Sequence, residues 1–348
     1  MKQQADKLNI VYTPLHGTGN VPVRRVLKDL GIKRLHVVPG QEHPDPAFPT
    51  VKAPNPEERQ SFDLAMALAN QKDANLILAT DPDSDRLGVA IRNADHEFVI
   101  LTGNQIGCLL MDYILSQKRQ SFTGDEFVVK SIVTSDMVDV IAKHYGVELR
   151  SVFTGFKFIA EQIKLAERTG KGRFIFGFEE SYGYLAGDKD AVQAATMIAE
   201  AACWYNSLGR TLYEVLIDMY EKYGWFEELV ISKTLYGREG IEKIQGAVST
   251  LRKKYPETIG GFHVLAVRDY LRQERIDMQT GKTEPLGMEQ SNVLYFELDG
   301  GRFIIRPSGT EPKLKSYLST SSMNKQEAEY QLNKLKESAV NLIDKLTE

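Results

Sequence analysis

The sequence predicts an α/β protein in which two consecutive α/β domains are followed by a C-terminal α+β domain. Apolar strand-like runs alternate with helix-like segments from Leu8 to about Tyr223, as in proteins with parallel sheets. After Gly224 the order changes to one helix, several strand-like runs and a terminal helix. A length of 348 residues also suits two or three domains of roughly 100–150 residues each.

The expected elements of the first domain follow from apolar runs separated by turn residues. A buried strand is expected at Leu8–Thr13, and the GTGN turn then leads into a helix that carries Val23, Val26, Leu27 and Leu30. A strand at Leu35–Val38, a proline-rich loop, a helix with Phe62, Leu64, Met66 and Leu68, and a strand at Leu76–Ala79 complete it.

The second and third domains are expected to differ in their order of elements. The second has helices near 104–116, 137–145, 156–168, 190–207 and 211–223, with strands at Phe127–Val133, Glu148–Phe153 and Arg173–Phe178. The third has a helix at Ile241–Tyr255, strands at Phe262–Val267, Val293–Leu298, Phe303–Arg306 and Leu314–Leu318, and a terminal amphipathic helix.

Composition narrows the class of protein. The net charge of −4 gives no reason to expect a nucleic-acid or anionic-membrane partner. The two cysteines, Cys108 and Cys203, lie in apolar helix-like stretches, which favours buried thiols in a reducing compartment. No signal peptide is evident and no apolar run reaches the roughly 18 residues of a membrane span. We therefore expect a cytoplasmic protein, and the sequence carries no prediction of its oligomeric state.

Three aspartates interrupt an apolar stretch in "NLILATDPDSDRLGVA". Asp81, Asp83 and Asp85 alternate along the chain, so in an extended segment their side chains would share one face. A divalent cation would relieve the repulsion between them, and an all-oxygen set favours Mg²⁺. The position after an α/β strand is also where ligands gather in such sheets. We therefore predict a metal site.

Three alternatives apply to this loop. An EF-hand is excluded, because its sixth and twelfth positions, which require Gly and Glu, hold Arg86 and Arg92. A phosphatase with an aspartyl nucleophile would also place an Asp-x-Asp pair after a strand. A solvated acidic turn is the remaining structural interpretation.

Two further loops carry candidate binding groups. In "GGRFIIRPSGTEPKLKSY", Arg306, Ser308, Gly309 and Thr310 are expected in a turn whose N–H and hydroxyl groups suit a phosphate. A hairpin turn closed by local hydrogen bonds is the alternative. In "FGFEESYGYLAGDKD", Glu179, Glu180 and Ser181 follow an apolar strand. Such groups suit a polyhydroxylated ligand, although helix capping accounts for them equally well.

Together these motifs resemble the α-D-phosphohexomutase family, in its phosphoglucomutase/phosphomannomutase branch. "TDPDSDR", "GFEESYGYL" and "RPSGTEPKLK" occur in the family's order, and "TPLHGTGN" and "TGFKFI" match its pattern as well. The resemblance covers essentially the whole chain. It implies family domains two, three and four at residues 1–102, 103–226 and 227–348.

The resemblance also implies an activity, that of an isomerase which transfers a phosphoryl group reversibly between the 1- and 6-positions of a hexose. In the family a phosphoserine donates its phosphate, and a 1,6-bisphosphate intermediate returns the other one. The metal would be Mg²⁺ at Asp81, Asp83 and Asp85. The implied roles of the other residues are Arg86 beside the reacting phosphate, Glu179 and Ser181 on the sugar hydroxyls, Arg306, Ser308, Gly309 and Thr310 on the other phosphate, and Thr154, Gly155, Lys130 and Lys189 elsewhere in the site.

One departure from the family pattern limits the predicted activity. The family's nucleophile lies in a T-A-S-H-N-P type loop of a first domain, and no Ser-His-Asn-Pro string occurs here. We therefore expect a fragment, inactive alone, of a phosphoglucomutase-type enzyme. The motif "GFEESYG" resembles the phosphoglucomutase side of the family and so favours glucose phosphates as the substrates of the whole enzyme, with mannose or pentose phosphates left open. The alternative is a truncated homologue that binds phosphosugar or metal without catalysis.

Overall fold

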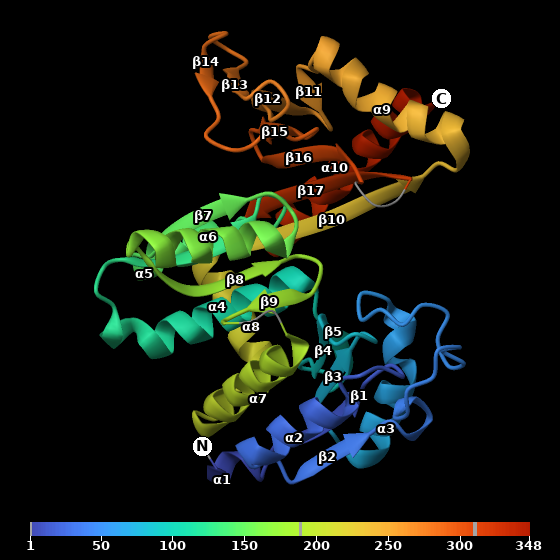
Figure 1. The fold of residues 1–348 in the computed structure, drawn as a ribbon, viewed down its shortest axis with the longest axis vertical. Helices are drawn as coiled ribbons and strands as arrows, with labels where there is room; N and C mark the ends of the chain where they lie inside the picture. The colour runs from blue at the N-terminus through green and yellow to red at the C-terminus, as the bar shows by residue number, and fades with distance from the viewer. Residues whose placement is uncertain (1, 188–189, 309–311) are drawn as a thin grey trace. The chain divides into compact units, whose positions relative to one another are not determined.

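The computed structural model describes residues 2–187, 190–308 and 312–348, and they form two compact units, residues 1–222 and 223–348 (Figure 1). Within these described ranges, no helix is both long enough and apolar enough to cross a lipid bilayer. Each unit has its own sheets and cores and is described separately below.

The first sheet of unit 1 has the strand order β2-β1-β3-β4-β5, in which β2, β1 and β3 are parallel and β4 and β5 are antiparallel. Its strands are β1 (Asn9–Thr13), β2 (Arg34–Val37), β3 (Leu76–Thr80), β4 (Leu87–Arg92) and β5 (Phe98–Ile100). Its helical segments are α1 (Lys2–Ala5), α2 (Asn20–Leu30), η1 (Pro39–Gln41), η2 (Arg59–Phe62) and α3 (Asp63–Lys72). Every residue of β1 and β3 is buried, because helices cover both faces of the sheet.

The second sheet of unit 1 repeats this arrangement with the order β7-β6-β8-β9, in which only β9 is antiparallel. Its strands are β6 (Glu126–Ser131), β7 (Glu148–Val152), β8 (Arg173–Glu179) and β9 (Gly183–Leu185). The helices are α4 (Gly103–Lys118), η3 (Arg119–Ser121), α5 (Met137–Tyr145), α6 (Phe156–Thr169), α7 (Ala191–Ser207) and α8 (Leu212–Tyr223). A capping box at Thr102 and Gln105 begins α4.

Helix α7 joins the two halves of unit 1, because it contacts α4 and β9 of the second half and also α2 and β4 of the first. The core of the first half lies between the sheet and α3, around Val11, Ile77 and Phe62. The core of the second half lies around Phe127, Val129 and Ile159 of α6. Both cysteines are buried and neither forms a disulfide, as expected.

Unit 2 is built on one antiparallel sheet with the order β10-β17-β16-β15-β12-β13-β14, with β11 beside β12. Its strands are β10 (Trp225–Thr234), β11 (Thr258–Ile259), β12 (Phe262–Asp269), β13 (Glu274–Asp277), β14 (Thr283–Pro285), β15 (Leu294–Leu298), β16 (Gly301–Pro307) and β17 (Lys313–Ser322). Helices α9 (Gly237–Lys253) and α10 (Lys325–Thr347) contact each other and the sheet (Figure 1). Their shared core contains Val248, Phe296, Phe303 and Leu335.

The predicted fold class is confirmed, but several strands were not predicted. The ten-residue strand β10 pairs along its whole length with β17, and β4, β5, β9, β11, β13 and β14 are also additional. Most residues of β10 are half-buried, so it lacks the buried apolar run on which the sequence prediction depended. The pairing partner, which lies about 90 residues away in the sequence, makes this segment a strand.

Candidate active site

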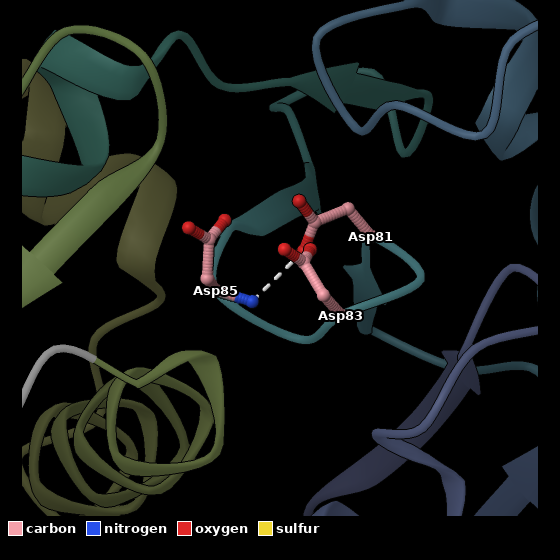
Figure 2. Close-up of side chains that lie close together, drawn as sticks. All are labelled: Asp81, Asp83 and Asp85. Carbon is pink, nitrogen blue, oxygen red and sulfur yellow. Dashed lines mark hydrogen bonds between the residues drawn. The ribbon is translucent and has the colours of Figure 1, made fainter.

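The three aspartates lie in a six-residue loop between β3 and β4, at the carboxyl end of β3. Each offers one carboxylate oxygen, and these three oxygens lie within 4.8 Å of one another (Figure 2). The segment is a turn and not the extended chain from which their convergence was predicted, and Ser84 has a left-handed φ of 60°. The carboxylates therefore meet because the loop folds back on itself.

Asp81 is the most buried of the three carboxylates, with 8% of its surface exposed. Its Oδ1 atom accepts hydrogen bonds from the backbone N–H groups of Asp85 (3.0 Å, the dashed line in Figure 2) and Arg86 (2.9 Å). Burial raises the pKa of Asp81 to about 7, with further increases from Asp85 and Asp83, although the N–H of Arg86 lowers it. The loop thus concentrates negative charge in a partly desolvated place.

This donor set fits a hard divalent cation. It consists of carboxylate oxygens alone, it has no sulfur or imidazole ligand, and its members range from buried Asp81 to exposed Asp83. The exposed side leaves room for water or a ligand oxygen to complete an octahedral shell. Magnesium is the ion that these residues suit best.

A second loop beside the same sheet, the predicted "TPLHGTGN" turn, packs against the aspartate loop at Pro82. A Cβ atom on Gly17 would lie 2.4 Å from the Cα of Pro82, so only glycine permits this approach. The N–H of Thr18 donates to the Pro82 carbonyl at 2.8 Å, and its hydroxyl donates to the same oxygen at 3.1 Å. This packing fixes the position of the residue between Asp81 and Asp83.

Arg86, which the resemblance implies beside the reacting phosphate, is the last residue of the aspartate loop, and its closest charged partner is a residue that was not predicted. Its Nη1 atom is 2.5 Å from Oε1 of Glu57, whereas its Nε atom is 3.8 Å from both Asp81 Oδ2 and Asp85 Oδ1. Glu57 belongs to the loop between η1 and η2. The proline-rich segment "APNPEE" was the available sequence signal for a fixed loop at this place.

The predicted sugar loop connects β8 to β9 and joins two of the sequence motifs. Glu179 is buried at the end of β8, and its Oε1 atom accepts a 2.5 Å hydrogen bond from the N–H of Gly155. Gly155 has a φ of 127°, which favours glycine, and Thr154 precedes it. Ser181 is half-buried in the turn, and Oε2 of Glu180 accepts a 3.3 Å hydrogen bond from the Ser131 hydroxyl.

The aspartate loop and the sugar loop lie side by side within unit 1. The N–H of Leu87, directly after the aspartate loop, donates to the carbonyl of Tyr182 in the sugar loop at 3.0 Å. The N–H of Ala191, the first residue of α7, donates to the carbonyl of Ser84 at 3.1 Å. Two loops that are about 95 residues apart in sequence are therefore neighbours, and the start of α7 also contacts the aspartate loop.

Lys130 is buried near the carboxyl end of β6, with 3% of its surface exposed. Its ammonium group donates to the carbonyl of Ser135 at 3.2 Å and to the carboxylate of Asp136 at 3.1 Å, and it also pairs with Asp139. The structure thus places this predicted site residue in an ion-pair network at the start of α5.

The predicted phosphate loop lies in unit 2, between β16 and β17. Arg306 lies in β16, in agreement with the strand predicted at Phe303–Arg306, and directly before the turn that was expected to hold it. Its Nη2 atom donates to the Tyr317 hydroxyl at 3.0 Å. Its Nε atom is buried and has no hydrogen-bond partner among the described residues, as a group that awaits an anion would be. The N–H of Ser308 donates to the carbonyl of Lys313 at 2.8 Å. Gly309, Thr310 and Lys189 lie outside the described residues.

Comparison with known domain families matches three consecutive parts of the chain. Residues 1–94 match Phosphoglucomutase/phosphomannomutase, alpha/beta/alpha domain II, and residues 102–223 match domain III. Residues 252–332 match the C-terminal domain of the same family. The boundaries predicted at 102/103 and 226/227 stay a prediction.

Curated relatives and solved structures agree with these matches. The phosphoglucomutase of Staphylococcus aureus strain MRSA252 is 40% identical over 316 residues, which are 90% of this chain and 56% of the relative. That of strain MSSA476 is 38% identical over 94% of this chain and 59% of the relative. The chain thus spans somewhat more than half the length of these relatives.

Two solved structures share the fold at low sequence identity. The Paramecium phosphoprotein pp63/parafusin, a phosphoglucomutase, has a TM-score of 0.69 at 17% identity over 99% of this chain and 60% of that one. The Aspergillus fumigatus N-acetylphosphoglucosamine mutase, solved with GlcNAc-6P and magnesium, has a TM-score of 0.54 at 12% identity. It matches over 97% of this chain and 68% of that one.

Proposed function

This chain belongs to the phosphoglucomutase/phosphomannomutase family, and on that premise we propose that it is the metal-, sugar- and phosphate-binding part of a mutase that interconverts α-D-glucose 1-phosphate and 6-phosphate. Mannose phosphates are a second candidate pair of substrates, because the 3- and 4-hydroxyls are the same in both sugars. The observation that carries the proposal is the junction of the aspartate loop and the sugar loop, made by the hydrogen bond from the N–H of Leu87 to the carbonyl of Tyr182.

Each binding group has a proposed role that follows from its chemistry. The carboxylate of Glu179 and the hydroxyl of Ser181 would bind the 3- and 4-hydroxyls of the sugar, which both donate and accept hydrogen bonds. Gly155 orients Glu179 through its N–H, and Thr154 would line the same pocket. Lys130 would contribute positive charge near the sugar, with Asp136 and Asp139 fixing its ammonium.

The anionic ends of the substrate have separate proposed partners. Arg306 would bind the phosphate that does not react, through the Nε atom that has no described partner, together with Ser308, Gly309 and Thr310. Lys189 is a further candidate for a residue that binds the substrate. Asp81, Asp83 and Asp85 would hold Mg²⁺, which when bound neutralises charge on the transferring phosphoryl group. Arg86 would lie at the edge of that site.

The complete reaction requires a group that these loops do not supply. Phosphoryl transfer through a 1,6-bisphosphate needs an oxygen nucleophile held in line with the sugar hydroxyl. The family serine loop has no counterpart in the sequence, so we propose that the 348 residues alone bind hexose phosphates without turnover. A non-catalytic binding protein is the alternative function, and the missing serine motif is the observation that favours it.

Binding of glucose 1-phosphate to the 348-residue protein, measured by calorimetry with Mg²⁺ present, tests the proposal. Arg306→Ala removes a charge-assisted contact with a net value of about 1.5–3 kcal/mol, so affinity should fall at least tenfold. Arg238→Ala is the matched control, because Arg238 is an exposed arginine of the same unit and its side chain pairs only with Glu242 among the described residues. Equal affinity in wild type and Arg306→Ala would reject the phosphate site.

A turnover assay tests whether these 348 residues lack the nucleophile, as proposed. The purified protein is incubated with glucose 1-phosphate, Mg²⁺ and a trace of glucose 1,6-bisphosphate, and glucose 6-phosphate is measured. We expect no product above the background of the Asp83→Ala variant. Turnover that survives removal of contaminating host mutase would overturn the proposed absence of the nucleophile.

A further inference from the structure

Glu57 forms an ion pair with Arg86, the last residue of the aspartate loop. Its Oε1 atom accepts a hydrogen bond from Nη1 of Arg86 at 2.5 Å. The Nε atom of the same guanidinium lies 3.8 Å from Asp81 Oδ2 and 3.8 Å from Asp85 Oδ1. Arg86 therefore has three acidic partners, and the closest contact is with Glu57.

The backbone that carries Glu57 is anchored on both sides. Its N–H donates to Oδ1 of Asn55 at 3.0 Å, and the hydroxyl of buried Ser61 donates to the Asn55 carbonyl at 2.7 Å. Pro56 is buried against Gly88 of β4, where an added Cβ atom would lie 2.7 Å from the Pro56 side chain. The glutamate thus extends from a fixed loop, so its carboxylate has a defined place near Arg86.

The charge of Arg86 creates a conflict with metal binding. An arginine guanidinium binds carboxylates in bidentate geometry, and the oxygens of Asp81 and Asp85 that it would take are those that a divalent cation needs. Glu57 offers the guanidinium another acceptor. Both side chains of the pair are 38% exposed, so the pair itself contributes little to the stability of the fold. The ion pair instead determines toward which carboxylate the Arg86 guanidinium points.

We propose that Glu57 is a positioning residue that draws the Arg86 guanidinium toward itself, so that a divalent cation can compete for the carboxylate oxygens of Asp81 and Asp85, which lie 3.8 Å from the Nε atom of Arg86. The inference rests on the proposed function, because it assumes the metal site in the aspartate loop. It assigns a role to a residue that contacts neither the metal nor the substrate. The same arrangement keeps the guanidinium at the edge of the site, where the proposed phosphate would lie.

A double-mutant cycle on metal affinity tests this role. Binding of Mn²⁺, used as a spectroscopic substitute for Mg²⁺, is measured by electron paramagnetic resonance in wild type, Glu57→Gln, Arg86→Gln and the double variant. Glu57→Gln should lower the affinity about threefold to tenfold, because the released guanidinium then competes with the ion. In the Arg86→Gln background the same change should have no effect, because there is no guanidinium to hold back.

Glu58→Gln is the matched control, since it removes one neighbouring negative charge and should leave the affinity unchanged. An equal loss from Glu57→Gln with and without Arg86 would overturn the inference, because Glu57 would then act only through its own charge. Unchanged affinity in Glu57→Gln would overturn it as well. If wild type and Asp83→Asn bind Mn²⁺ equally, the metal site of the proposed function fails, and the inference fails with it.

Discussion

The two halves of unit 1 have the same sheet topology but place different chemistry at the same point. The strand orders β2-β1-β3-β4 and β7-β6-β8-β9 correspond strand by strand, with the last strand antiparallel in each. The aspartate loop connects β3 to β4, and the sugar loop connects β8 to β9. The two halves thus repeat one architecture, and the residues of the connecting loop differ between them.

Loop length explains how the two loops hold their carboxylates. The aspartate loop has room to fold back, so Asp81 accepts hydrogen bonds from two N–H groups of its own loop. The sugar loop is a tight turn between Glu179 and Gly183, and Glu179 takes its N–H donor from Gly155 of another loop. The first site is therefore local, whereas the second depends on the packing of α6.

Glycine substitutions offer the strongest way to disturb each loop separately. Gly17→Ala would place a methyl group 2.4 Å from the backbone of Pro82, and Gly103→Ala would place one 2.0 Å from the carbonyl oxygen of Glu180. Since backbone must move in both cases, each change should cost about 2–4 kcal/mol of unfolding free energy. Metal affinity should fall in Gly17→Ala, and glucose 1-phosphate affinity should fall in Gly103→Ala, as measured by calorimetry.

The control for these two variants is Gly246→Ala on α9, where an added Cβ atom meets nothing within 4 Å. That change should stabilise the protein by up to about 1 kcal/mol, because alanine favours the helix. Loss of both affinities in both glycine variants would show that the two loops do not act separately.

The residue that begins β6 should make the stability of the second half of unit 1 depend on acidic pH, whereas the residue that begins β1 in the first half should not. Glu126 is buried there and pairs with Arg173, whereas Asn9 at the corresponding point of β1 is neutral and bonds to backbone carbonyls. Burial pushes the pKa of Glu126 up, but the Arg173 guanidinium and the N–H groups of Thr123 and Gly124 outweigh it and lower the pKa to about 2.

A folded-state pKa below the unfolded value stabilises the protein above that unfolded value, near 4.5, and the contribution is lost as the pH falls toward 2. Glu126→Gln should therefore cost about 2 kcal/mol at pH 7 and flatten the pH dependence of stability below pH 5. Chemical denaturation of wild type and variant at several pH values measures both effects. A variant whose stability keeps the full wild-type slope between pH 5 and pH 3 would contradict the assignment.

Substitution of a single carboxylate in each loop should show, with the smallest structural disturbance, that the two loops bind different ligands. Asp83 is exposed, so Asp83→Asn should leave stability unchanged while it lowers Mg²⁺ affinity about tenfold or more. Glu179→Gln should lower glucose 1-phosphate affinity and keep the metal affinity. Calorimetric titration of both ligands into both variants gives the comparison. Equal Mg²⁺ affinity in wild type and Asp83→Asn would place the ion elsewhere.

The sequence by itself determined the fold class, most helices and the composition of each binding loop. Apolar runs such as Leu76–Thr80 are strands in any α/β context because they are too apolar to remain exposed, and Met137–Tyr145 forms the helix that its periodicity predicts. The three aspartates could also be recognised in the sequence as a candidate metal site, because like charges on alternate residues between buried segments have few structural explanations.

Only the tertiary structure decided how these residues meet. The approach of Gly17 to Pro82 and the pairing of Glu57 with Arg86 both depend on contacts between segments distant in the sequence. The strand β10 likewise exists because β17 supplies its hydrogen-bond partners. Local sequence sets the preference of each segment, but long-range packing and pairing determine which polar groups share a site, since those energies belong to pairs of segments and not to either one.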